Sequence, residues 1–138
     1  MSFSSKIYIV SSCLVGLCTR YDAKTSENIV CRKRLINNIY IPVCPEQMGG
    51  LTTPREAADI TGGDGHDVLA GKAKVLTKSG KDVTKAFIQG ARQVLSIASA
   101  QQIDTILLKS RSPSCAVQGK IGVTAALLQQ NGYFVEDF

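Results

Sequence analysis

The chain has 138 residues, of which 44% are hydrophobic and 20% charged, and it carries a formal net charge of +5 with a pI near 9.0. This length suits one hydrophobic core and is short for two, so we expect a single domain over residues 1–138. No apolar run approaches the roughly 18 residues that cross a bilayer, and the first residues lack the pattern of a secretory leader. We therefore expect a cytoplasmic protein with no membrane partner.

The basic charge does not by itself indicate a nucleic-acid-binding protein. Lys and Arg are spread along the chain, with one run at residues 32–34, and aromatic residues make up only 6% with no Trp. Platforms for single strands interleave aromatic faces with positive charge, and this pattern is missing here. We expect no stable nucleic-acid complex. The charge is typical of a solvated surface, and attraction of a small anionic substrate remains an alternative.

Short apolar runs of β-type residues alternate with segments of helical periodicity. In chain order the patterns predict a strand at 7–12, a helix over 26–38, a strand at 40–43, a helix over 84–101, a strand at 105–108, a helix over 122–131 and a strand at 133–135. In the first helix, Ile29, Val30, Leu35 and Ile36 would form the apolar face, and Gly132 would close the last helix. Because strands that alternate with helices form parallel sheets, we predict an α/β fold. Its expected form is a Rossmann-like three-layer sandwich with a mainly parallel sheet of about four strands.

The segment between the second strand and the 84–101 helix is predicted to be irregular. Gly49, Gly50 and Pro54 interrupt the periodic pattern, and the Gly-rich stretch 62–65 interrupts it again. Two short strands, at 73–76 and near Val83, are predicted on either side of a turn signal. Such a hairpin would lie over the edge of the sheet.

Three cysteines follow the ends of predicted strands: Cys13 the first, Cys44 the second and Cys115 the third. The carboxyl ends of parallel strands share one edge, and ligands of open α/β sheets bind in the crevice outside that edge. Five cysteines, an odd number, in a cytoplasmic protein favour bound or catalytic thiols over a disulfide framework. We therefore predict a metal or cluster site formed by these three thiols.

The loops after the strands add polar groups to this edge. Glu46 lies two residues beyond Cys44 and fits either a general acid or base beside a metal or a carboxylate in the first turn of a helix. The loop at 109–115 is dense in hydroxyls and amides, which suits an anion or a cluster sulfide but also an ordinary polar loop. Lys109, Arg111 or the amides near Gly122 are expected to hold an anionic substrate. The expected substrate-contacting residues are Ser12, Lys109, Ser110, Ser114 and Gly122.

The remaining cysteines and the one histidine carry weaker signals. Cys18 lies five residues beyond Cys13 and leaves open a closed zinc site with four cysteine ligands. Cys31 falls inside the first predicted helix and is interpreted as a core thiol. His66 lies in the Gly-rich stretch and is expected at the surface, which argues against histidine-based zinc chemistry. The stretch 119–124 lacks the spaced glycines of a phosphate loop and is interpreted as a helix start.

The same loops resemble those of a known family. The matching segments are, in order, 12–16 with 18–22, 42–46 with 49–51 and 54–55, 82–84, 109–115 and 122–127. They extend over almost the whole chain and are similar to the successive signatures of the thiouracil desulfidases, short bacterial proteins formerly catalogued as a domain of unknown function.

The resemblance implies a cofactor and a reaction. It implies a 4Fe-4S cluster bound by Cys13, Cys44 and Cys115, with a fourth iron open to the sulfur of a thiocarbonyl compound. It also implies that Glu46 and Ser112 supply the acid/base and hydroxyl groups, while the role of Cys18 does not follow. The implied protein is an iron-sulfur-dependent desulfidase of a thiolated pyrimidine, with a small thiolated base or nucleotide as its partner.

Two features leave the function more open than the fold. Ala116 stands where family members usually have Gly, and only residues 117–121 precede the last helix, where the family usually has a longer segment. The alternatives are a cluster-dependent sulfur carrier or thiolation enzyme, which would need the same open iron, and a non-catalytic zinc or redox-sensing module.

Overall fold

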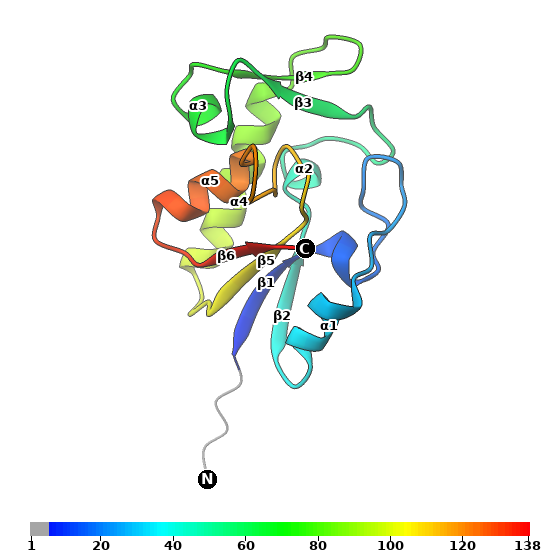
Figure 1. The fold of residues 1–138 in the computed structure, drawn as a ribbon, viewed down its shortest axis with the longest axis vertical. Coiled ribbons are helices and arrows are strands. Elements are labelled where there is room, and N and C mark those ends of the chain that lie inside the picture. Colours follow the sequence, from blue (N-terminus) through cyan, green and yellow to red (C-terminus); the bar gives the residue numbers. More distant parts are fainter. Residues whose placement is uncertain (1–5) are drawn as a thin grey trace.

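A computed structural model describes residues 6–138, and its centre is a parallel sheet (Figure 1). The strands are β1 (Ile7–Ser11), β2 (Ile39–Val43), β5 (Thr105–Leu108) and β6 (Val135–Asp137), in the spatial order β2-β1-β5-β6. The predicted α/β fold with four mainly parallel strands is confirmed. Only β6 begins two residues later than predicted, because the Tyr133 amide donates to the Leu128 carbonyl and closes the preceding helix.

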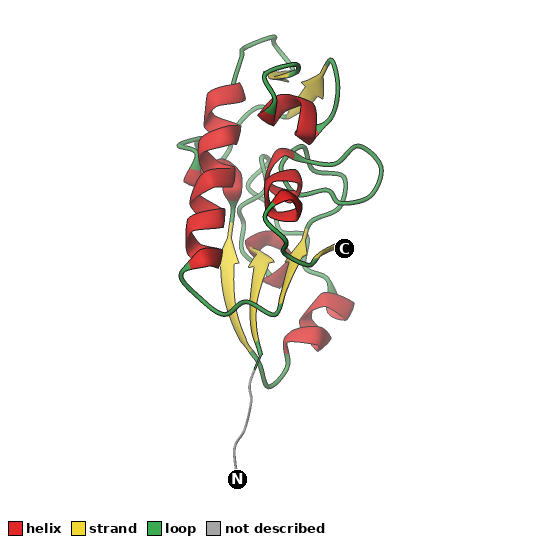
Figure 2. Cartoon of the chain, turned by 90° about the vertical axis from the view of Figure 1, so that its left-hand side faces the viewer, coloured by secondary structure: helices red, strands yellow, loops and turns green. Residues whose placement is uncertain are grey.

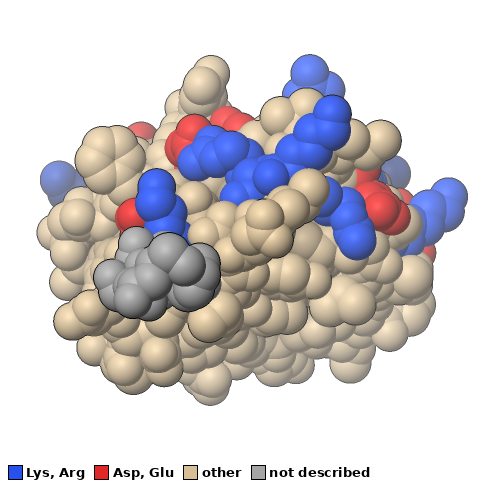
Figure 3. All heavy atoms as spheres, turned by 90° about the horizontal axis from the view of Figure 1, so that it is seen from below, with Lys and Arg blue, Asp and Glu red and all other residues tan. Residues whose placement is uncertain are grey.

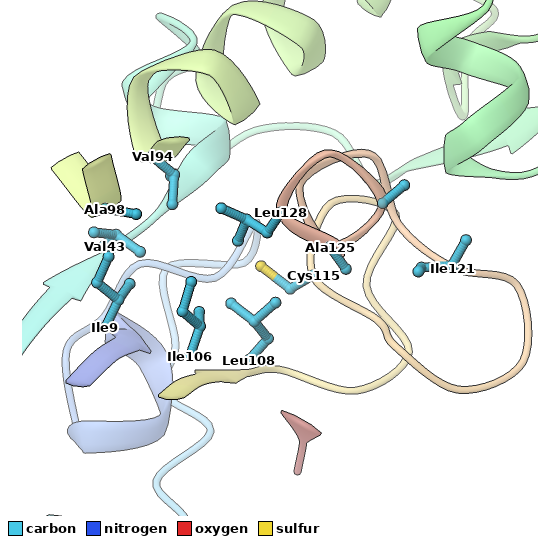
Figure 4. Packing of buried hydrophobic residues seen from close by; sticks show 11 residues of the cluster. Ile9, Val43, Val94, Ala98, Ile106, Leu108, Cys115, Ile121, Ala125 and Leu128 are labelled. Carbon is cyan, nitrogen blue, oxygen red and sulfur yellow. The ribbon is translucent and has the colours of Figure 1, made fainter. Parts of the chain in front are cut away.

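Side chains alternate between the two faces of the sheet, and helices cover both faces. Ile9, Ile106 and Leu108 pack with helices α4 (Thr84–Ser99) and α5 (Val123–Gln130), as Figure 4 shows. Tyr8 and Val10 point the other way and pack with helix α1 (Ile29–Leu35). Figure 2 accordingly shows α4 and α1 on opposite sides of the strands. This arrangement is the expected three-layer sandwich.

The chain connections locate the point where the strand order reverses. From β1 the chain passes through α1 to β2 on one side, and it later returns through α4 to β5 on the other side of β1. The two crossover helices therefore lie on opposite faces and diverge at the carboxyl ends of β1 and β5. Open α/β sheets bind their ligands at this switch point.

Helix α1 differs from its prediction in length and in the face that it buries. It begins only after Asn28, whose side-chain oxygen accepts a hydrogen bond of 2.9 Å from the Cys31 amide. From that start, Cys31 and Leu35 are one turn apart and face the sheet, whereas Ile29 and Val30 are 69% and 64% exposed. The predicted apolar face is therefore confirmed for Leu35 and wrong for Ile29, Val30 and Ile36, and the interpretation of Cys31 as a core thiol is confirmed.

The predicted irregular segment contains four short elements, and its apolar side chains form a small core with residues of α4 and α5. The four elements are α2 (Pro45–Met48), β3 (Ala58–Thr61), α3 (Gly65–Leu69) and β4 (Lys74–Thr77). A reciprocal capping box between Asp64 and Asp67 starts α3 within the Gly-rich stretch. Strand β4 pairs antiparallel with β3, and the predicted strand near Val83 is reduced to an isolated antiparallel bridge between Leu76 and Asp82. Residues there start α4 instead, because the Asp82 carboxylate accepts hydrogen bonds from Thr84.

Two ion pairs form among the charged side chains at the end of the molecule away from β3 and β4. Figure 3 views that end and shows acidic groups beside several Lys and Arg side chains. Arg32 pairs with Glu27 at 3.2 Å and Arg34 with Glu136 at 2.8 Å, which fits the interpretation of the 32–34 run as a solvated helix face.

Among residues 6–138, no helix is both long enough and apolar enough to cross a membrane.

Candidate active site and cluster-binding site

The loops that follow β1, β2 and β5 enclose a cavity of about 440 Å³ at the carboxyl edge of the sheet. Its lining includes the side chains singled out in the sequence at this edge: Ser12, Cys13, Cys44, Glu46, Lys109, Ser110, Arg111, Ser112, Ser114 and Cys115. The structure therefore brings together three thiols that are far apart in the sequence.

Cys13 lies in the 3₁₀ helix η1 (Ser12–Val15), which continues directly from β1. Its carbonyl accepts hydrogen bonds of 3.0 Å from the Ser26 amide and the Thr25 hydroxyl, and these bonds hold the returning loop. Burial, and secondarily the neighbouring Cys44, raise the pKa of the Cys13 thiol, while the Lys109 ammonium opposes the shift. Lys109 lines the same cavity as Cys13.

Cys44 is the N-cap residue of α2, with Pro45 in the first turn. Proline suits this position because its φ is already helical and its missing amide hydrogen needs no partner there. The Cys44 thiol lies 3.6 Å from the Thr19 carbonyl of the first loop. The first and second loops therefore meet at this sulfur.

Cys115 lies where the core meets the cavity, beside Ala125 and Leu128 (Figure 4). Burial raises the pKa of its thiol to about 12, with smaller contributions from Cys44, Glu46 and Cys13. The three thiols therefore lie close enough to influence one another. Each must lose its proton when a metal binds, so binding at this site releases protons.

The donor set suits a cluster better than a single ion. Within the described part of the chain, no group of three His, Cys, Asp or Glu side chains is close enough to hold one metal ion. Cys18 is exposed and is not part of the cavity wall, so the structure does not form the closed zinc site of four cysteines. A cluster of several irons is larger than one ion and takes its thiolate ligands from further apart.

The carboxylate of Glu46 is held at both oxygens beside the thiols. Arg55 Nε donates to Glu46 Oε1 at 3.0 Å, and the Ser114 hydroxyl donates to Oε2 at 2.8 Å. Ser112 and Ser114 hydroxyls are 3.2 Å apart, so Ser112 reaches Glu46 only through Ser114. Ser114, which the sequence suggested as a substrate contact, is the direct neighbour of the carboxylate.

Helix α5 holds the third loop in place through its first amides. Val123 N donates to the Pro113 carbonyl at 2.9 Å, and Thr124 N donates to the Ser114 carbonyl at 2.8 Å. Gly122 donates its amide to Ala116 and does not line the cavity. A Cβ atom at Gly122 would clash with the Ser114 backbone. The expected contact of these amides with an anionic substrate is therefore wrong, because they bind the loop carbonyls.

Other predicted residues lie around the site or away from it. Lys109 Nζ donates to the Ser110 carbonyl at 3.1 Å, and the Ser12 hydroxyl is 2.6 Å from that of Thr19. His66 lies on α3 outside the cavity wall, with Nδ1 2.9 Å from the amide of Gln130. The short segment 117–121 is bound to β6, since the Val117 amide donates to Asp137 at 2.7 Å.

Arg55 is a site residue that reasoning from individual residues missed, although it lies within a segment of the family resemblance. Its side chain is only 8% exposed, lines the cavity and contacts both Glu46 and Cys44. It comes from a loop without periodicity, next to one proline and two threonines that carry no chemical signature. The signal in the sequence that could have identified it is the pair Pro54-Arg55 after Gly49 and Gly50, which belongs to the family resemblance.

Comparisons with known proteins show the family to which the chain belongs. A family model described as 2-thiouracil desulfurase matches residues 8–137. The protein YbbK of Bacillus subtilis (strain 168), described as uncharacterized, is 42% identical over 139 residues, which cover 92% of each chain. The solved structure of the [4Fe-4S]-dependent thiouracil desulfidase TudS is 34% identical, has a TM-score of 0.81, and the match covers 97% of this chain and 91% of that one. The resemblance of the loops is thus confirmed, and the chain belongs to the 2-thiouracil desulfurase family.

Proposed function

We propose that this protein is a cytoplasmic desulfidase that uses a 4Fe-4S cluster to remove sulfur from a thiolated pyrimidine or a related thiocarbonyl compound. Membership of the 2-thiouracil desulfurase family and the likeness to TudS support this proposal. The observation that carries it is the convergence of Cys13, Cys44 and Cys115 with the carboxylate of Glu46 on one cavity.

The residues of the cavity fit such a cluster. Cys13, Cys44 and Cys115 are its proposed ligands, because thiolates are the soft donors that iron-sulfur clusters require. When bound, a cluster with three protein ligands supplies a thiophilic iron with a free coordination position for the sulfur of the substrate. Glu46 and Ser114 remain beside the ligands, and their oxygens are available for proton transfer.

Glu46 is the proposed general base. Its side chain is 14% exposed and held at both oxygens, so one water molecule at the cavity wall can approach it from a defined direction. Taking a proton from that water would promote attack on the carbon of the C=S group. The overall reaction consumes one water and exchanges the sulfur for oxygen, which leaves a carbonyl compound and hydrosulfide.

The cationic side of the cavity is the proposed place for the rest of the substrate. Lys109 and Arg111 line it together with the hydroxyls of Ser12 and Ser110, and these groups can bind carbonyl oxygens or an anionic substituent. Ser112 lies in the same wall and is proposed to orient water or substrate through its hydroxyl.

The test is anaerobic reconstitution with iron and sulfide, followed by incubation with a panel of thiolated pyrimidines and an assay for released sulfide. We expect release by the wild-type protein and a loss on the order of a hundredfold or more in Glu46→Gln, which keeps its size but not its basicity. Glu27→Gln is the control, because Glu27 pairs with Arg32 outside this cavity. A wild-type rate in Glu46→Gln would refute the general base, and no release from any compound would refute the desulfidase.

A further inference from the structure

The guanidinium of Arg55 has a partner for each of its N–H groups. Nε donates to Glu46 Oε1 at 3.0 Å, Nη1 donates to the Thr52 carbonyl at 3.2 Å and to the Thr53 hydroxyl at 2.7 Å, and Nη2 donates to the Thr19 carbonyl at 3.0 Å. Nη2 also lies 3.8 Å from the Cys44 sulfur. These contacts use all five donors of the side chain.

These bonds connect two segments beyond the ends of the paired strands β1 and β2. Thr19 belongs to the loop after β1, whereas Cys44 is the N-cap residue of α2 and Glu46 lies in its first turn. The backbone strengthens the connection, because the Arg55 amide donates to the Tyr21 carbonyl at 2.8 Å. A planar group with fixed donor directions that is buried among several acceptors determines their relative positions.

We propose that Arg55 is a positioning residue of the reaction that aligns the Glu46 carboxylate and the Cys44 sulfur in one rigid frame. The proposal deepens the desulfidase function and rests on it. Arg55 itself touches neither water nor substrate in the proposed reaction, and it acts through the two side chains to which it donates.

The effect on Glu46 is to fix the direction of its oxygens. With Oε1 bonded to Arg55 and Oε2 to Ser114, rotation of the carboxylate would break both contacts. Lysine could supply the same charge, but its single ammonium has no planar fork to hold Glu46 and the loop carbonyls together. Arg55→Lys therefore keeps the positive charge and removes the planar donor arrangement, so it tests the two contributions separately.

The effect on Cys44 is a hydrogen bond to a ligand sulfur. An N–H group directed at a thiolate withdraws electron density from it, and hydrogen bonds to ligand sulfurs raise the reduction potential of a cluster. Loss of this donor should therefore make the potential of the bound cluster more negative. This effect is independent of turnover, so it tests the role of Arg55 without reference to the substrate.

The first experiment is a double-mutant cycle with Arg55→Lys and Glu46→Gln. We expect Arg55→Lys to assemble the cluster and to lower kcat about tenfold with little change in KM, as outer-shell partners of metal sites do. In the Glu46→Gln background, Arg55→Lys should lower kcat by clearly less, because the general base that Arg55 aligns is already lost and only its contact with Cys44 remains. Arg32→Lys makes the same exchange at an exposed ion pair outside the cavity and should behave as wild type.

The second experiment measures the cluster potential of the same holoproteins by spectroelectrochemistry. A more negative potential in Arg55→Lys, together with an unchanged one in Arg32→Lys, supports the bond to Cys44. An unchanged potential, a wild-type kcat or independent losses in the double mutant would each overturn the alignment of both groups by Arg55. If the wild-type protein desulfurises nothing, the proposed function fails, while the potential still decides the role of Arg55.

Discussion

The carboxyl edge of the sheet and the face covered by α1 both bury cysteine thiols, but among different neighbours. Cys115 and Cys13 are buried at the edge, where a cavity, a third thiol, a carboxylate and several hydroxyls surround them. Cys31 is fully buried on the α1 face and packs with Tyr8, Val10 and other apolar side chains.

The difference shows what distinguishes the proposed ligand thiols from a packing thiol. Burial raises the pKa of both Cys115 and Cys31, to about 12 and about 11, so neither burial nor proton affinity separates them. What separates them is the shared cavity: the three thiols at the sheet edge come from three different segments and all line the same cavity. Cys31 is closed in by apolar groups and serves as a small hydrophobic side chain.

The largest expected effect comes from removing a thiol at the edge. Cys13→Ala, Cys44→Ala or Cys115→Ala should abolish most of the visible charge-transfer absorbance after anaerobic reconstitution, because each leaves only two of the three proposed ligands. Cys31→Ala is the matched control and should keep the full spectrum and iron content. A complete cluster in Cys115→Ala would contradict the assignment of ligands by convergence.

A smaller effect is expected from the hydroxyl that links the third loop to the carboxylate. Ser114→Ala removes the donor to Glu46 Oε2, and sulfide release should fall about tenfold while the visible spectrum is retained. Ser99→Ala serves as a control, since the Ser99 hydroxyl bonds only to carbonyls of its own helix. Equal rates in Ser114→Ala and wild type would show that Arg55 alone is enough to hold Glu46.

On the α1 face, the prediction concerns stability rather than chemistry. Cys31→Ala leaves a small void beside Leu35 and Leu107, and the free energy of unfolding of the apoprotein should fall by roughly 1–2 kcal/mol. Denaturant titration of wild type and variant measures this difference. A variant that unfolds at the wild-type denaturant concentration would contradict the close packing of this thiol.

The smallest effect is a pH dependence of stability that Cys31 introduces. Burial raises the pKa of this thiol from an ordinary 9.0 to about 11. Its contribution to stability is full below pH 9.0 and is lost as the pH rises toward 11, because the unfolded thiol releases its proton first. Unfolding of the apoprotein should therefore become easier over this range, and less so in Cys31→Ala. Identical pH profiles of the two proteins would argue against the shift.

The sheet and the convergence of the three thiols could be predicted because their signals are local. A short apolar run that ends in a cysteine marks both a strand and its carboxyl end, and parallel strands bring such ends together. The orientation of α1 could not be predicted from its apolar residues, since the Asn28 cap determines where the helix starts. A shift of a few residues in the start of a helix changes which side chains face the core.

Two further parts of the site depend on tertiary contacts that no local pattern encodes. Arg55 gains its partners from two other loops, and its own segment has no periodicity. The amides at the start of α5 could bind either an anion or loop carbonyls, and only the close approach of Gly122 to the Ser114 backbone decides between them. The residues at the start of α5 are the same whether its amides bind an anion or loop carbonyls, so the sequence of this segment does not distinguish the two.

The support that α5 gives to the third loop has a consequence for the order of events during synthesis. Cys13 and Cys44 emerge early from the ribosome, whereas the loop that carries Cys115 gains its hydrogen bonds to Val123 and Thr124 only when the last helix is present. A partly translated chain therefore offers two of the three proposed ligand thiols and no complete site. Loading of a cofactor must follow folding of the entire sheet, and the free energy of that binding then adds to the stability of the finished protein.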